Sequence, residues 1–217
     1  MRPSTPERLH IGPLLSSLGN DIKPAHFRRN QIIFSKGDRS DSIFYIQKGS
    51  VKLTLTSRQG KEAVIAVLAA GSFFGDSALA SDRPPRPSHA VALMDVRAAT
   101  IDPDAMVRLL HKDDDVCDAV ISSLIALKTK VIGNFGDNLL YSSEERLARA
   151  LLSIAKLYED PELWPGPKLS QQDLANMIGI TRQRVNFFLK RFKKSGFVDY
   201  GGGLRVHSSI VKVVGKD

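Results

Sequence analysis

The chain has 217 residues, of which 42% are hydrophobic and 25% charged, as is ordinary for a globular protein of one or two domains. The single cysteine, Cys117, excludes an internal disulfide and a zinc or iron–sulfur site held by several cysteines of one chain. The longest apolar run, residues 63–70, is too short to span a membrane, and the first residues contain no apolar signal segment. We therefore expect a cytoplasmic protein without a membrane partner.

Positive charge is concentrated near the carboxyl end of the chain. The formal net charge is +8, and residues 179–206 carry seven lysines and arginines against a single acid, Asp199. A stripe this dense is typical of a face that binds a polyanion, although a solvated helix face has the same composition. Charge alone does not separate these two interpretations.

Residues 26–101 predict a β-rich domain. Short apolar stretches at roughly ten-residue spacing are separated by glycine-containing turns, which is typical of a β-sandwich or barrel. Residues 83–87 (RPPRP) predict a loop or a sheet edge, because proline donates no ladder hydrogen bond. The expected strands are 31–34, 43–47, 51–56, 63–68 and 90–93.

A helical period begins near Asp113. The acidic run 113–115 suits the positive end of a helix dipole, and Gly136 is the expected end of the helix. Its apolar stripe could pack on the β domain or pair with a second copy of the chain, and we expect pairing in a two-fold homodimer. The stripe consists of Val116, Val120, Leu124, Leu127, Val131 and Phe135.

Residues 168–206 predict a helix, a turn, a second helix and a β-hairpin in that order. They follow a helix over 143–158 and a proline-rich loop over 159–167. Ser170 is a good N-cap for the first helix, Gly179 supplies the tight turn, and Thr181 can cap the second helix. This order favours duplex DNA as a partner over a purely structural helix pair.

The second helix has an apolar face and a polar face. Arginine pairs with guanine edges, glutamine and asparagine match adenine, and further basic or hydroxyl side chains hold phosphates. The predicted DNA-binding residues are Ser170, Thr181, Arg182, Gln183, Arg184, Asn186 and Lys190.

Four segments resemble the cyclic-AMP receptor protein / fumarate–nitrate regulator (CRP/FNR) family of bacterial transcription factors. They are Lys36-Gly37-Asp38, Ile46–Lys52, Phe73–Asp76 and Leu169–Phe197. The resemblance covers nearly the whole chain. It implies an α+β fold with a jelly-roll, cyclic-nucleotide-binding-like sensor domain over 1–112, a dimerisation helix over 113–137 and a winged helix-turn-helix over 138–217. It also implies RNA polymerase as a partner, through the loop 158–167.

The family's cyclic-nucleotide pocket carries over only in part. At its phosphate-binding positions Asp76 is shorter than the family's glutamate, and Pro87 replaces a serine and lacks an N–H. The adenine-contacting pair aligns with Val131-Ile132, which cannot donate hydrogen bonds. We therefore expect no cofactor, and an effector other than cyclic AMP or none at all. The candidate ligand-binding residues are Gly75, Asp76, Ser77, Arg86, Ser88 and Val131.

The second helix of the predicted DNA-binding motif also departs from the family, which carries arginine–glutamate and another arginine four residues later. Here Arg182-Gln183 and Phe187 occupy those positions, so we expect a different operator in which Arg182 still reads guanine. The alternative is a small-molecule-binding module whose winged helix contacts protein, and the salt dependence of duplex binding would distinguish the two. No nucleophile–base pair, metal-ligand spacing or phosphate-binding loop predicts an enzyme.

Overall fold

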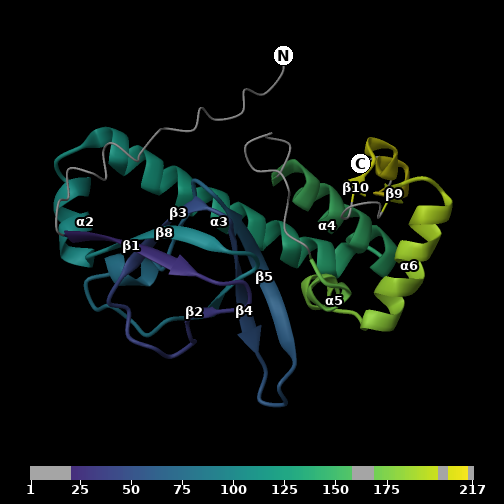
Figure 1. Ribbon diagram of the computed structural model, residues 1–217, viewed down its shortest axis with the longest axis horizontal. Coiled ribbons are helices and arrows are strands. Elements are labelled where there is room, and N and C mark those ends of the chain that lie inside the picture. The colour runs from purple at the N-terminus through teal and green to yellow at the C-terminus, as the bar shows by residue number, and fades with distance from the viewer. Residues whose placement is uncertain (1–20, 158–168, 200–204, 215–217) are drawn as a thin grey trace.

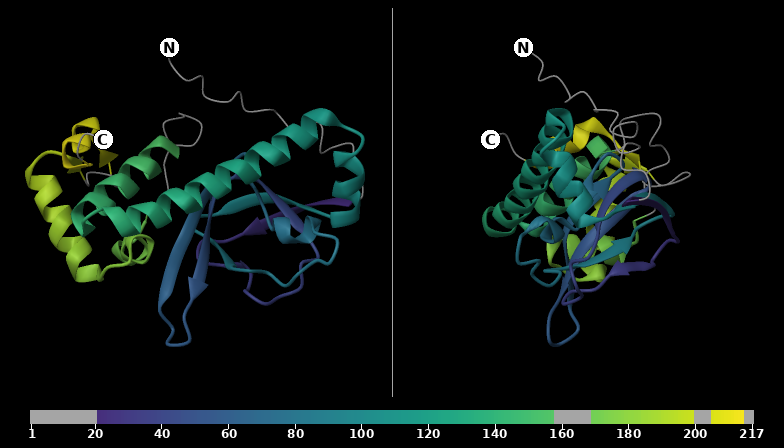
Figure 2. Two further views of the ribbon diagram at one scale, coloured as in Figure 1. Left: turned by 180° about the vertical axis from the view of Figure 1, so that it is seen from behind. Right: turned by 90° about the vertical axis from the view of Figure 1, so that its left-hand side faces the viewer.

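The computed structural model describes residues 21–157, 169–199 and 205–214, so the predicted loop 158–167 and the glycine turn 201–203 lie outside it. A β-sandwich forms one end of the molecule and a helical head the other, and one long helix runs along both (Figure 1). Figure 2 shows the same helix lying across the sandwich from behind. No helix among the described residues is long and apolar enough to cross a membrane.

The sandwich consists of two four-stranded antiparallel sheets, with strand orders β1-β8-β3-β6 and β2-β7-β4-β5. This arrangement confirms the predicted fold class. The strands are β1 (Ile22–Phe27), β2 (Ile32–Phe34), β3 (Ile43–Lys48), β4 (Ser50–Thr56), β5 (Glu62–Ala69), β6 (Phe73–Phe74), β7 (His89–Ala92) and β8 (Val96–Ile101).

Three of these strands and the helix that follows them were not predicted. Pro24 weakens the strand pattern of β1, but β1 is an edge strand, where a missing N–H is tolerated. β8 has alanines at its centre, and β6 has only two residues. The helix α2 (Pro103–Leu110) has the usual signals of a helix start, because the Asp102 side chain accepts from the Ala105 N–H and Pro103 follows it.

Aromatic rings fill the interior of the sandwich. Phe44 and Phe74 stack with their centroids 4.9 Å apart, and Phe34 lies 5.9 and 6.0 Å from them. Leu127 and Val131 of the long helix pack against the same cluster. The sandwich and the long helix therefore share one core.

The long helix α3 (Asp114–Leu140) begins at the Asp113 cap, as predicted, but the expected end at Gly136 is wrong. A glycine inside a helix costs only about 1 kcal/mol, and the helix continues until Tyr141 becomes extended. The prediction that its apolar stripe pairs with a second copy of the chain is also wrong. Val116 to Val131 pack on the sandwich, and only Phe135 points away, with 66% of it exposed.

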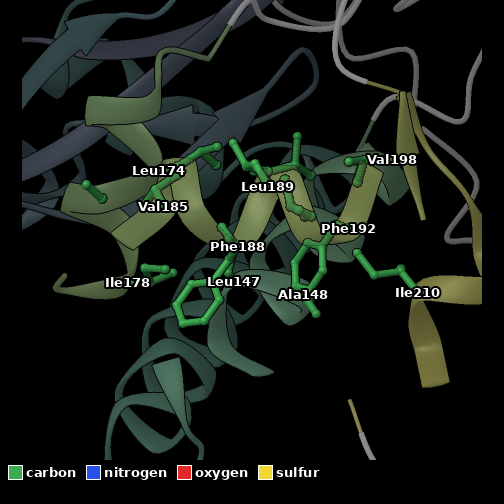
Figure 3. Packing of buried hydrophobic residues seen from close by; sticks show 13 residues of the cluster. Leu147, Ala148, Leu174, Ile178, Val185, Phe188, Leu189, Phe192, Val198 and Ile210 are labelled. Atoms are coloured by element: carbon green, nitrogen blue, oxygen red, sulfur yellow. The ribbon is translucent and has the colours of Figure 1, made fainter. Parts of the chain in front are cut away.

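The head is held by one apolar core, drawn from every element around it (Figure 3). Leu147, Leu174, Val185 and Phe192 are all at most 1% exposed. The elements are α4 (Ser143–Leu157), α5 (Gln171–Ile178), α6 (Arg182–Lys194), β9 (Val198–Asp199), β10 (Arg205–Val206), a 3-10 turn η4 (Ser208–Ile210) and α7 (Val211–Val214).

Candidate functional site

The turn between α5 and α6 has the geometry of a helix-turn-helix. The Ser170 hydroxyl accepts from the Asp173 N–H and the Asp173 carboxylate accepts from the Ser170 N–H, which together form a capping box. Gly179 ends α5 in the left-handed region at φ 71°, where a side chain would be strained. Thr181 then caps α6. The pairing of β9 with β10 confirms the wing at the residues that the structure describes.

The outer face of α6 lies at the far end of the head from the sandwich (Figure 1). Arg182, Gln183, Arg184 and Lys190 are exposed on it. Within the described part of the chain, neither Arg182 nor Gln183 hydrogen-bonds to another side chain. Their polar groups therefore remain available to a ligand.

Asn186 and the two capping residues are engaged more closely with the protein. Asn186 is half-buried, and its amide oxygen accepts from Gln171 Nε2 at 3.5 Å. Ser170 and Thr181 are exposed but use their hydroxyls as caps. The Thr181 hydroxyl can still donate to a phosphate while it caps, whereas the Ser170 hydroxyl already donates to the Asp173 carboxylate at 2.6 Å. All seven residues remain predictions for DNA binding.

Polar contacts join the head to the sandwich, and the sequence analysis missed them. Lys52 of β4 donates to Glu62 of β5 and to Asp173 of α5, both at 2.9 Å, and Asn176 donates to Glu62 at 3.0 Å. Burial opposes the charge on Lys52, but its hydrogen bonds to Asp173 and Glu62 raise its pKa. Burial likewise opposes the charge on Asp173, but hydrogen bonds from Ser170 and Lys52 lower its pKa. Both partners are therefore charged at neutral pH.

An apolar contact lies beside this ion pair. Leu169 and Met177 of the head pack against Val64, Val67 and Leu93 of the sandwich. The first helix of the helix-turn-helix is therefore docked on the sensor domain, whereas the outer face of α6 is left open.

The connection between α3 and α4 is braced by two arginines. Arg149 donates to Asp137 at 2.8 Å, and its guanidinium lies 4.3 Å from the centre of the Tyr141 ring. Arg146 donates to the Asn138 carbonyl at 3.1 Å. These contacts cross the end of α3 and join it to α4.

The candidate ligand site is built around Arg86, which is only 2% exposed. Its guanidinium donates to the carbonyls of Gly75 at 2.9 Å and Ser42 at 2.6 Å, and lies 4.4 Å from the centre of the Phe34 ring. Burial lowers the pKa of Arg86, although Asp41 and two other nearby carboxylates oppose this effect. Two of its three nitrogens are thus bound within the protein, and the third, Nε, is buried without a hydrogen-bond partner among the described residues.

The other candidate ligand residues do not form an anion site around this arginine. Asp76 is exposed and adds negative charge, and the Ser77 hydroxyl is hydrogen-bonded to Ser40 at 2.9 Å. Ser88 is buried, and Val131 packs on the aromatic core. A cyclic nucleotide needs donors for its phosphate and for adenine, so these residues do not fit one.

The described residues contain no group of three or more His, Cys, Asp and Glu side chains placed to hold a metal ion. Cys117 is a free, half-buried thiol.

Comparisons with known proteins agree with this architecture. Residues 24–113 match the family model of the cyclic nucleotide-binding domain, and residues 145–208 match that of the Crp-like helix-turn-helix domain. The CRP-like cAMP-activated global transcriptional regulator of Mycobacterium tuberculosis is 25% identical over 191 residues, 87% of this chain and 85% of that protein. The cAMP-activated global transcriptional regulator Vfr of Pseudomonas aeruginosa is 25% identical over 206 residues, 91% and 93% of the two chains.

The fold is also found in a solved structure. The structure of FixK2 from Bradyrhizobium japonicum superposes with a TM-score of 0.77 at 15% identity, covering 90% of this chain and 98% of that one. With a cyclic nucleotide-binding domain, a long helix and a Crp-like helix-turn-helix in one chain, this protein belongs to the CRP/FNR family of DNA-binding transcription regulators.

Proposed function

We propose that the protein is a homodimer that binds a palindromic operator, and that its sensor domain responds to an effector other than cyclic AMP or to none. A second apolar stripe on α3 is the observation that carries the dimer. A regulator of this kind works where the chromosome is, so we place it in the cytoplasm and assign it no catalytic activity.

The second stripe lies on a different face of α3 from the one that packs on the sandwich. Its members are between 48% and 69% exposed, and their spacing is that of heptad a and d positions, with Lys128 at the one polar position. A second copy of the chain presents the same stripe, so an isologous contact would remove both from water. The members are Ile121, Ile125, Ile132, Phe135 and Leu139.

This second stripe, the seam of the proposed dimer, extends the dimerisation segment beyond the predicted range 113–137. The interface also bears on where a dimer holds its two heads, because α6 lies at the far end of the head in each copy (Figure 2). Two such helices would enter successive major grooves about 34 Å apart, which requires an operator with two-fold symmetry.

Three features of the sensor domain support an effector other than cyclic AMP. Arg86, a candidate ligand-binding residue, is bound to backbone carbonyls, acidic residues lie around it, and Val131 offers adenine no hydrogen bond. Domain docking through Lys52 and Asp173 gives any effector a route to the head. Contact with RNA polymerase through residues 158–167, which lie outside the described part of the chain, stays a prediction.

Selection of bound sites from a random duplex library, with and without cyclic AMP, tests the operator and the effector together. We expect one palindrome in both pools, and binding to it that weakens steeply with salt. Recovery of no enriched sequence from either pool would overturn operator binding that needs no effector. Enrichment only with cyclic AMP would overturn the proposal for the sensor.

The oligomeric state tests the seam. Ile125→Asp should yield a monomer in sedimentation velocity and lose affinity for the palindrome, because it places a charge at the centre of the stripe. Ile32→Asp is the matched control, since Ile32 on the sandwich is also 58% exposed but lies outside the seam. A dimeric Ile125→Asp variant would show that the stripe is not the interface.

A further inference from the structure

We propose that Phe187 reads thymine, with its ring packed against the 5-methyl group of one thymine in each operator half-site. The proposal rests on the operator binding proposed above and adds an apolar contact to the polar readers of α6.

Phe187 is the exception among the phenylalanines of α6. It is 58% exposed, whereas Phe188 and Phe192 are 7% and 1% exposed and belong to the core of the head. At about 100° per residue, Phe187 lies about 40° from Gln183 and about 60° from Lys190 around the helix axis. It therefore lies at the centre of the outward face.

The contacts of Phe187 hold the ring without covering it. Its centroid lies 5.6 Å from that of Phe188, edge to face, and the Arg191 guanidinium lies 5.9 Å from it. Arg191 is in turn anchored to Glu144 at 3.1 Å. The ring thus stands in water with its position restricted from one side, which lowers the entropy lost when a ligand packs on it.

The charge around Phe187 selects the kind of partner. Arg184, Lys190 and Lys194 lie near it on the helix and are exposed. An apolar protein groove would have to accept these cations, whereas the phosphates that flank a major groove complement them.

Within the major groove, one group suits a phenyl ring. The edges of guanine, adenine and cytosine present hydrogen-bonding groups, and thymine adds a methyl group, the apolar target with which phenylalanine side chains make contact. Phe187 has no donor or acceptor, so a polar base edge against it would lose water without gaining a partner. The thymine methyl group makes no hydrogen bond to water, so contact with the ring costs it none.

The test removes only that methyl group. The selected operator is made with deoxyuridine in place of each thymine in turn, and the affinity is measured by fluorescence anisotropy. At one position in each half-site we expect wild-type affinity to fall about fourfold, the value of burying one methyl-sized group. Phe187→Ala should bind the thymine and deoxyuridine operators equally. Gln183→Ala, on the same face, should keep the difference.

A complementary arm adds the methyl back. In an operator that carries cytosine at the position so identified, 5-methylcytosine should restore part of the wild-type affinity and none of that of Phe187→Ala. Since Phe187 is exposed, its variant should melt as the wild type does.

The outcomes separate this contact from the operator proposal. Specific operator binding with no sensitivity to any deoxyuridine would overturn the thymine contact alone. A Phe187→Ala protein that keeps the deoxyuridine effect would assign the methyl group to another residue. If the wild-type protein binds no operator specifically, the operator proposal fails and the thymine contact fails with it.

Discussion

The reading face and the sensor domain use their arginines in opposite ways. Arg182 is exposed at the start of α6, and its guanidinium makes no hydrogen bond to another side chain among the described residues. Arg86, a candidate ligand-binding residue, is buried and donates to two carbonyls of its own chain. A guanidinium binds a ligand only with donors that the fold leaves unused. The head therefore keeps an open binding surface, whereas in the sensor two guanidinium nitrogens are bound within the protein and only the buried Nε has no partner among the described residues.

The largest effect is expected for Arg86→Ala, which removes the buried arginine of the sensor. We expect it to lower the free energy of unfolding by about 3–5 kcal/mol, because two buried carbonyls lose their donor and a cavity opens over Phe34. Chemical denaturation followed by circular dichroism measures the loss.

The control for this variant is Arg83→Ala. Arg83 is a neighbouring arginine with an exposed side chain that pairs only with Asp104 among the described residues, so its loss should change stability by no more than about 0.5 kcal/mol. Cyclic AMP should not raise the melting temperature of the wild type. An Arg86→Ala protein of wild-type stability would show instead that the guanidinium is held for a ligand.

Arg182→Ala addresses the other side of the comparison. Stability should not change, but operator affinity should fall by about 1–3 kcal/mol per half-site, and only for operators with the original base pair at one position. Binding to operators substituted at each base pair locates that position.

Arg184→Ala serves as the contrast to Arg182→Ala. As a predicted phosphate contact, Arg184 should contribute equally to all sequences, and its removal should reduce the salt slope by about one. If Arg182→Ala also weakens binding evenly over all sequences, its role as a base reader is wrong.

The head was predictable because its signals are local. Ser170, Gly179 and Thr181 each mark a helix boundary within a few residues of the helices they limit, and the core of the head follows helical spacing. Helical spacing does not say what covers a stripe, so it predicts a dimer contact for the face of α3 that in fact packs on the sandwich. Lys52 and Asp173 are 121 residues apart, and no local pattern connects them.

That contact between domains gives the third prediction, Lys52→Met. The change leaves Asp173 and Glu62 without their shared cation, and we expect docking of α5 on β4 and β5 to weaken by about 1–2 kcal/mol, less than for a fully buried pair. Hydrogen exchange of the α5 amides should become faster. Lys61→Met is the control, since Lys61 is exposed next to Glu62 on the same hairpin.

The pKa shifts set the pH range of this contact. The raised pKa of Lys52 keeps its contribution until the pH rises through that value, and the lowered pKa of Asp173 keeps its contribution until the pH falls through that value. The effect of Lys52→Met should therefore be constant from about pH 5 to pH 9. An effect that changes inside this range would mean that a different titrating group holds the domains together.

The smallest expected effect concerns Lys130, a cation whose burial lowers the stability of the folded protein. Lys130 of α3 donates to the Val67 carbonyl at 2.6 Å, and burial lowers its pKa to about 8. Above pH 8 and below its ordinary value, the unfolded chain binds more protons than the folded one, so wild-type stability should rise with pH there. Lys130→Met should gain about 1 kcal/mol at pH 7, after allowance for partial exposure and the lost hydrogen bond.

This gain should shrink as the pH rises above 8, because the wild type then loses the charge that burial penalises. Denaturation of both proteins at pH 7 and pH 10 measures it, with Lys112→Met as an exposed control. A Lys130→Met variant less stable than wild type by the same amount at both pH values would contradict the prediction. The contact of Lys130 with β5 would then stabilise the fold, and burial of its charge would not lower the free energy of unfolding.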